Sequence, residues 1–191
     1  MNRSVAVGTV SVLLLLGVAA APAAGGPPAH ARSATSFSGS CAVEGLVQFD
    51  PAVTLVPGPL TYTYEADGTC SGDLDGTELS DAPVTVQQAG ASEGSCSRAE
   101  TTSPGEGVVT FPDGRSLTYT LEFSSVVTEI DFTFEGTRSG TAVGHGTFDT
   151  DRTPPDKASE CATGLTEIPM DMTLETESPL VGQTRGRSGK G

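Results

Sequence analysis

The side chains that could perform acid–base chemistry are few in this sequence. His145 is the one histidine that follows the N-terminal leader, residues 1–31, so any serine or cysteine nucleophile that needs an imidazole base would depend on it. Gly144 and Gly146 flank it in a segment that alternates like a strand. The competing interpretation, an ordinary half-exposed histidine without a catalytic role, is the one that this setting favours. The pattern therefore predicts a protein that is not an enzyme, and nothing in it indicates a cofactor.

A short acidic run has the composition of a cation site. Asp73, Asp75 and Glu78 place three carboxylates around Gly76, and Ca²⁺ prefers several oxygen ligands in a short flexible turn. The remaining ligand spacing of an EF-hand loop is missing. A solvated acidic turn is the main interpretation, and a Ca²⁺ site is the alternative.

Paired carboxylates are the chemistry of glycoside hydrolysis, and several acidic residues could supply them. All of these alternate with apolar residues, which predicts exposed positions where charge serves solubility. The chain has no Trp and only three Tyr to stack on sugar rings, which argues against a hydrolase. The candidates are Glu129, Asp131, Glu135, Glu167 and Asp171.

Arg98 is the one basic residue close to a cysteine, two positions after Cys96. Small secreted protease inhibitors present a rigid, substrate-like segment on a loop held by a disulfide, at low entropic cost. A plain surface arginine is the competing interpretation. The inhibitor is kept as one alternative function.

Residues 1–31 have the features of a secretory signal peptide. Arg3 precedes an apolar run of about 17 residues with four leucines at 13–16, shorter than the ~20 residues that a membrane span needs. Small-x-small motifs predict cleavage after Ala23 or Ala31. We therefore expect a secreted, extracellular protein that has no membrane anchor once the signal is removed.

Four cysteines, an even number in an exported chain, predict two disulfides. No two of them have the Cys-x-x-Cys spacing, and only one histidine follows the leader, so a zinc site is disfavoured. Three pairings are possible in principle. The four are Cys41, Cys70, Cys96 and Cys161.

Strand register selects among these pairings. An antiparallel hairpin centred near residue 55 would place Phe49 opposite Tyr62 and Cys41 opposite Cys70, within reach of a bridge. Cys96 would then pair with Cys161. This requires Asp67-Gly68 to be a bulge within a long second strand, whereas a hairpin turn at the same dipeptide is the competing interpretation.

Apolar and polar residues alternate from Ser36 to Thr176 without a helical stripe, which predicts an all-β fold. The segment 89–97, rich in Gly, Ser and Glu, is expected to be a loop, and the four strands from 107 to 148 a meander. Residues 149–158 are expected to form a polar connection. The expected strands cover about 36–49, a stretch from 60, 82–86, 107–111, 115–123, 126–135, 141–148 and 164–176.

Residues 32–178 are predicted to form one domain, and 179–191 a flexible polar tail. One apolar and one polar face per strand fits an antiparallel β-sandwich of about eight or nine strands, or a closed, calycin-like antiparallel β-barrel. Unequal strands and Pro-rich connections favour the sandwich. A barrel that carries a ligand needs a hollow interior, whereas large inward residues favour a filled one: Phe123, Phe132, Phe134 and Met172.

The chain is strongly acidic, with a formal charge of −14. Arg3 is the one charged residue of the leader, so its removal would take the charge to −15. Nucleic acids and anionic membrane surfaces need a cationic face on their partner. The charge therefore excludes both classes of partner.

Several short strings and a biased composition suggest a source. Gly-Ser-Cys occurs twice, Gly-Thr-Cys-Ser-Gly once at 68–72, and arginine outnumbers lysine in a chain rich in Ala, Gly, Pro and Thr. In these features the chain resembles uncharacterised secreted all-β proteins of high-GC Gram-positive bacteria. The resemblance implies secretion and an all-β fold, and it assigns no functional residue.

The sequence favours a monomeric, secreted, non-enzymatic binding or structural module whose ligand is unknown. An extracellular protein or a small apolar ligand is the expected partner. The alternatives are a small-ligand carrier of β-barrel type and the protease inhibitor with Arg98. A cavity of at least ~300 Å³ would distinguish a carrier from a solid sandwich.

Overall fold

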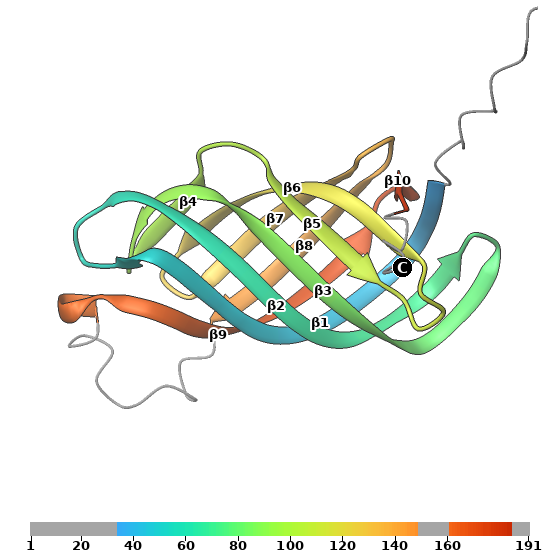
Figure 1. Cartoon of the computed structure of the whole chain (residues 1–191), viewed down its shortest axis with the longest axis horizontal. Coiled ribbons are helices and arrows are strands. Elements are labelled where there is room, and N and C mark those ends of the chain that lie inside the picture. The colour runs from blue at the N-terminus through green and yellow to red at the C-terminus, as the bar shows by residue number, and fades with distance from the viewer. Residues whose placement is uncertain (1–33, 149–160, 185–191) are drawn as a thin grey trace, which may run out of the picture. The chain divides into compact units, whose positions relative to one another are not determined.

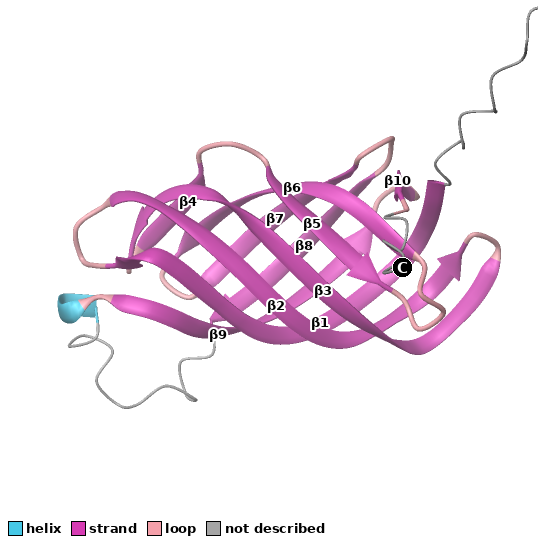
Figure 2. Cartoon of the chain, in the orientation of Figure 1, coloured by secondary structure: helices cyan, strands magenta, loops and turns pink. Residues whose placement is uncertain are grey.

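The computed structural model describes residues 34–148 and 161–184 (Figures 1 and 2). The described chain is almost entirely β, and a single helical turn at 161–163 precedes the last long strand. The strands are β1 (Ala34–Val53), β2 (Gly58–Leu74), β3 (Thr77–Ser95), β4 (Arg98–Thr101), β5 (Gly105–Thr110), β6 (Ser116–Val126), β7 (Glu129–Gly136), β8 (Thr141–Phe148), β9 (Leu165–Thr176) and β10 (Leu180–Gln183).

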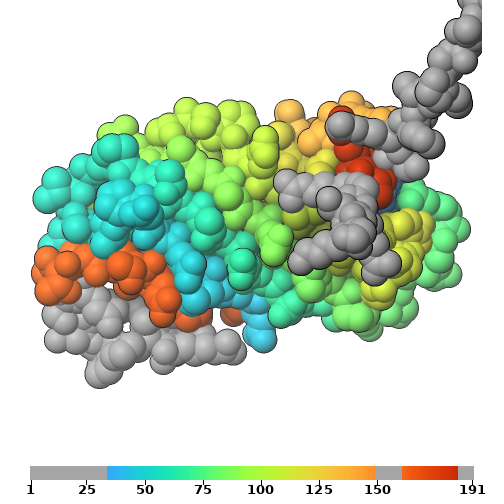
Figure 3. Space-filling view, viewed as in Figure 1, coloured from blue at the N-terminus to red at the C-terminus, as the bar shows by residue number. Residues whose placement is uncertain are grey.

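The strands form one antiparallel sheet that is rolled so that its halves face each other over one core (Figure 1). β1 pairs with β2 on one side and with β9 on the other, so the hydrogen bonding continues around the sheet. The expected antiparallel, sandwich-like all-β fold is confirmed, with the refinement that both facing halves belong to the same sheet. From one side the surface is formed mainly by residues of β1 to β6, coloured from blue to yellow, with β9 in orange along one margin (Figure 3).

The closure of this sheet is irregular, so the fold is not a clean barrel. β10 takes the place of β9 beside the first residues of β1, where Phe37 pairs with Leu180. β3 changes partner along its length, from β5 over 85–89 to β4 over 92–95. These changes allow strands of very different length to share one sheet.

The predicted β1–β2 hairpin is confirmed in its register. Phe49 lies opposite Tyr62 and Cys41 opposite Cys70, and both predicted disulfides form, Cys41–Cys70 and Cys96–Cys161. Register therefore identified the pairing, because directly opposed residues of an antiparallel pair are close enough for a bridge.

Asp67-Gly68 is neither the required bulge nor the competing turn. Both residues continue the regular β1–β2 ladder opposite Glu44 and Val43. The register shift lies a little further along, between Cys70 and Gly72 on the β3 side of β2. The chain turns back only at Asp75-Gly76, with φ of 53° and 81°, a two-residue turn of the kind for which Asp-Gly is favoured.

The expected loop at 89–97 is wrong for most of its length, because β3 continues without interruption to Ser95. Ala89, Gly90 and Ala91 pair with Thr63, Tyr62 and Thr61 of β2. A long partner strand supplies this ladder, and it overrides the low intrinsic β-propensity of Gly, Ala and Ser.

The meander is confirmed, because β5 to β8 each pair with the next strand. The expected tail differs from the structure at its start, where Leu180 is buried and residues 180–183 pair with β1. The leader with its cleavage positions, the connection 149–158 and residues 185–191 lie outside the described residues.

Large side chains fill one end of the rolled sheet. Phe134 and Met172 are buried there, as their alternation predicted. Phe132 is also buried and Phe123 is half-buried, but both border a hollow at the other end, so the expectation that these two rings fill the interior is wrong. Glycine makes room for these rings, since a Cβ atom at Gly144 would lie 2.7 Å from Cε2 of Phe134. The core at this end also contains Phe37, Leu74, Phe111, Leu117, Tyr119, Leu121 and Leu180.

Candidate ligand-binding pocket

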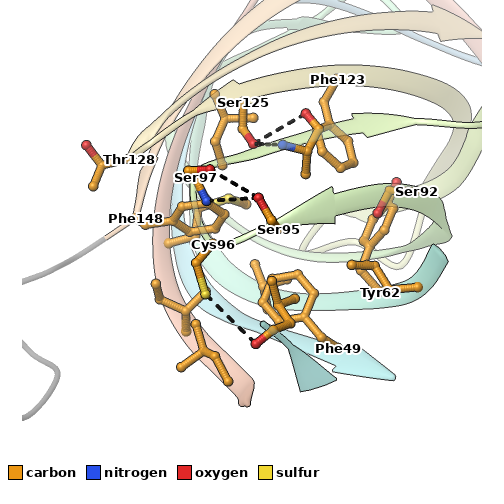
Figure 4. Close-up of a pocket in the computed structure, with 18 of the residues that line it drawn as sticks. Phe49, Tyr62, Ser92, Ser95, Cys96, Ser97, Phe123, Ser125, Thr128 and Phe148 are labelled. Atoms are coloured by element: carbon orange, nitrogen blue, oxygen red, sulfur yellow. Dashed lines mark hydrogen bonds between the residues drawn. The ribbon is translucent and has the colours of Figure 1, made fainter. Parts of the chain in front are cut away.

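The other end of the rolled sheet is hollow. A pocket of about 420 Å³ lies between the facing halves (Figure 4), within the range of about 300–1,000 Å³ that is usual for small-molecule sites. It exceeds the size that distinguishes a carrier from a solid sandwich. Its apolar lining includes Val47, Phe49, Val53, Leu60, Phe123, Ile130, Phe132, Phe148, Leu165, Ile168 and Met170.

The hollow exists because small residues occupy several lining positions. Ser92 and Ser95 of β3 line the pocket, as do Ala99 of β4 and Ser125 of β6. Ser92, Ser95 and Ser125 are buried. Their short side chains leave space at inner positions that a larger side chain would fill. Small side chains at these positions of β3, β4 and β6 leave a volume that the larger lining residues do not fill.

The pocket opens between the β1–β2 connection and the β6–β7 turn. Leu55 and Val127 line it and are each 63% exposed. Backbone hydrogen bonds hold the rim together: Cys96 N–H donates to Thr54 O at 3.0 Å, and Val127 N–H donates to Ser97 O at 2.9 Å. The Cys96–Cys161 disulfide lies in the same rim and ties the helical turn before β9 to the residue that follows β3.

Two polar side chains that line the pocket, Tyr64 and Gln88, already have hydrogen-bond partners. The Tyr64 hydroxyl donates to the carbonyl oxygen of Met170 at 3.2 Å. Gln88 donates through Nε2 to the Tyr119 hydroxyl at 2.9 Å. Burial raises the pKa of both tyrosines above the ordinary value of 10.0, so both are neutral phenols.

Two further lining hydroxyls differ from these. Tyr62 Oη and Ser92 Oγ are buried and have no hydrogen-bond partner within residues 34–148 and 161–184. Burial raises the pKa of Tyr62 to about 12, so its hydroxyl keeps its proton. None of the lining residues in the described ranges carries a charge. The arrangement suits an uncharged, mainly apolar molecule.

His145 lies on the outer surface and takes no part in this pocket. Its Nδ1 is 3.3 Å from Asp131 Oδ1, and its Nε2 is 2.7 Å from Glu129 Oε2. The hydrogen bond to Asp131, followed by the contact with Glu129, raises the pKa of the imidazole. No serine or cysteine nucleophile forms a hydrogen bond with its ring among the bonds found in the described residues.

Two carboxylates of the acidic run around the β2–β3 turn accept hydrogen bonds from other groups of the protein. Asp73 Oδ1 accepts from Gly76 N–H at 2.8 Å, and Asp75 accepts from Ser36 N–H at 2.8 Å. Asp75 also pairs with Arg115 at 3.1 Å, while Glu78 is exposed on β3. Within the residues that the structure describes, no group of three or more potential ligands could hold a metal ion.

The other candidates from the sequence also lie outside the pocket. Arg98 is in β4, paired with β3 and β6 on its two sides and in contact with Glu100, so it is not displayed on a loop. The five carboxylates considered for glycoside hydrolysis are exposed on β7 and β9, as predicted: Glu129, Asp131, Glu135, Glu167 and Asp171.

Sequence reasoning passed over Ser92, which belongs to the expected loop. The string at 90–94, Gly-Ala-Ser-Glu-Gly, has the Gly-x-Ser-x-Gly spacing of a hydrolase nucleophile turn. It lies instead within β3, with no strand-to-helix turn to expose the serine, and His145 is occupied elsewhere. Extending the alternation from Gln88 through Gly90 would have placed Ser92 on the inner face.

Comparisons of the chain with protein-family models, with curated proteins and with solved structures find no match. In the part of the chain that is described, no helix has the length and apolar character needed to cross a membrane. The class of the protein therefore rests on its fold and its pocket, an antiparallel β protein with an uncharged internal cavity.

Proposed function

We propose that this protein is a secreted, non-enzymatic binding protein that holds a small apolar molecule in the pocket between the halves of its rolled sheet. The observation that carries this proposal is the 420 Å³ pocket itself, uncharged and lined mainly by aliphatic and aromatic side chains. Burial of apolar ligand surface against such walls supplies the free energy of binding.

The filled end of the molecule supports the same function. Fully packed rings and aliphatic side chains there give the fold a solid core, so the walls of the hollow end are held in place without a ligand. A structural module would gain nothing from leaving the second half unpacked, because an unfilled cavity costs stability.

Secretion and the absence of catalysis belong to the same proposal. Two disulfides are typical of exported chains, and the leader has the pattern of a signal peptide. The single described histidine is engaged by carboxylates outside the pocket, so the pocket is proposed to bind rather than to convert its ligand.

The test is the binding of a neutral fluorescent probe, N-phenyl-1-naphthylamine, which brightens in apolar surroundings. The native protein is expected to give a saturable increase in fluorescence with one site per chain. Leu60, which lines the pocket, is then replaced by the larger tryptophan. The Leu60→Trp variant should lose binding at least tenfold, because the indole occupies the space of the probe.

Thr61→Trp is the matched control. Thr61 follows Leu60 in β2 but is exposed on the outer face, so the same substitution should leave binding unchanged. Circular dichroism during unfolding shows whether each variant is folded. A native protein without saturable binding, or two folded variants with equal affinity, would overturn the proposal.

A further inference from the structure

The pocket contains the two buried side-chain oxygens that the described residues leave without a hydrogen-bond partner. Tyr62 is 6% exposed and Ser92 is 1% exposed. Buried polar atoms are nearly always paired, because an unpaired one costs about 1–3 kcal/mol. Both unpaired atoms belong to residues that line the same pocket, and the rest of the described chain has no other such atom. This pocket is therefore the place where a hydrogen-bonding ligand is expected.

Register brings these two residues together. Tyr62 pairs with Gly90 and Leu60 pairs with Ser92 on the neighbouring strand, so Tyr62 and Ser92 are diagonal neighbours on the inner face. Figure 4 shows their side chains next to each other on one side of the pocket, away from Thr128. Both residues therefore belong to the same wall of the pocket.

The tyrosine ring is held rigidly. It packs edge-to-face against Phe123, with ring centroids 5.3 Å apart. A Cβ atom at Gly90 would lie 2.6 Å from its hydroxyl oxygen, and one at Gly105 would lie 2.5 Å from it, so both glycines keep room for the phenol. A donor that is already oriented loses little entropy on binding.

The chemistry of the lining defines the polar group of the ligand. Both hydroxyls can donate a hydrogen bond, and the tyrosine keeps its proton. The described lining residues include no lysine, arginine or histidine that could balance a buried carboxylate. An unpaired charge would be expelled from such a site, since burying it costs far more than burying a neutral group.

We infer that the pocket takes a neutral, mainly aliphatic molecule with one carbonyl or hydroxyl oxygen, which accepts hydrogen bonds from Tyr62 and Ser92. This inference rests on the proposed function and adds the class of ligand. Ketones, esters and alcohols belong to this class. Fatty acids in their ionised form and charged amphiphiles are excluded from it.

The experiment measures displacement of N-phenyl-1-naphthylamine by octane, octan-2-one and octanoate at neutral pH. In the native protein octan-2-one should bind at least tenfold more tightly than octanoate, whose charge would be buried unpaired. Tyr62→Phe combined with Ser92→Ala should weaken octan-2-one about tenfold, the effect of losing two hydrogen bonds. Octane has no oxygen, so its affinity should be unchanged in the same variant.

Ser124→Ala is the matched control, since Ser124 is exposed on β6 and does not line the pocket. It should leave all three affinities unchanged. Without ligand, the Tyr62 and Ser92 variants should unfold at the same denaturant concentration as the native protein or a higher one, because the hydroxyls that they remove are unpaired.

The outcomes separate the two proposals. If the double variant weakens octane and octan-2-one equally, or if octanoate binds most tightly, the ligand class is wrong and the binding function stands. If no compound displaces the probe and the probe itself does not bind, the binding function fails and the ligand class fails with it. A clear loss of stability in the unliganded variants would show partners within the fold and overturn the inference.

Discussion

At the residue scale, the rim of the pocket contains a valine in an unusual backbone conformation. Val127 has φ of 59° in the β6–β7 turn, a region that β-branched residues rarely adopt. Its side chain is 63% exposed and lines the pocket. Glycine or asparagine would fit this turn with less strain, so an apolar side chain is retained here at some cost in stability.

We expect Val127→Asn to raise the free energy of unfolding by about 1 kcal/mol, because asparagine tolerates the left-handed region. The measurement is equilibrium unfolding in urea. Val126→Asn is the control: Val126 is equally exposed but lies in β6 outside that region, so its replacement should bring no gain. Destabilisation by Val127→Asn would contradict the assignment of strain.

His145 is a second residue whose behaviour the structure predicts. Its contacts with Asp131 and Glu129 favour the protonated imidazole, so its pKa in the folded protein lies above 6.5. A raised pKa stabilises the folded state fully below the unfolded value, and this contribution disappears as pH rises through the folded value. The side chain is about half exposed, so salt should weaken the effect.

The titration of His145 by NMR should therefore give a pKa above 6.5, and both Asp131→Asn and Glu129→Gln should lower it. The signal is assigned by its loss in His145→Gln. A native pKa at or below 6.5 at low ionic strength would show that these contacts do not persist in solution.

At the scale of elements, the two disulfides have different positions relative to the pocket. Cys41–Cys70 joins directly opposed residues of β1 and β2. Cys96–Cys161 lies in the rim and joins the end of β3 to the segment before β9. The first reinforces a long hairpin that already has a complete ladder, and the second determines the shape of the opening.

Replacing either pair by alanine should lower the free energy of unfolding by about 2–4 kcal/mol, through the larger entropy of the unfolded chain. Only the loss of Cys96–Cys161 should also weaken binding of N-phenyl-1-naphthylamine, since only those sulfurs line the pocket. Urea unfolding and probe titration measure the two effects. Equal loss of binding in both variants would contradict the assignment of the rim.

At the scale of the whole molecule, one sheet serves two purposes. Its filled end provides the core that stabilises the fold, and its hollow end provides the pocket. In the described strands, Glu and Asp lie mainly on the outer faces, where they alternate with the buried residues. This arrangement places acidic side chains in water, where charge favours solubility, and none among the described residues that line the pocket.

The fold was largely predictable because alternation is a local property. In a strand whose apolar and polar residues alternate, the apolar face must be buried. The burial of Ile130, Phe132 and Phe134 therefore follows from the sequence without knowledge of the strands that they contact. The register of β1 and β2, and with it the Cys41–Cys70 bridge, followed from the same periodicity and one turn.

The pocket was not predictable in the same way, because a cavity depends on residues from strands far apart in the chain. The sequence by itself determined an all-β, disulfide-linked, acidic protein with one apolar face per strand. Only the tertiary structure decided that β1 closes the sheet by pairing with β9, and that Ser92, Ser95 and Ser125 meet at the same end of the interior. The volume of a cavity depends on the side chains of many strands together. The face of the sheet on which a residue lies depends on its own strand alone.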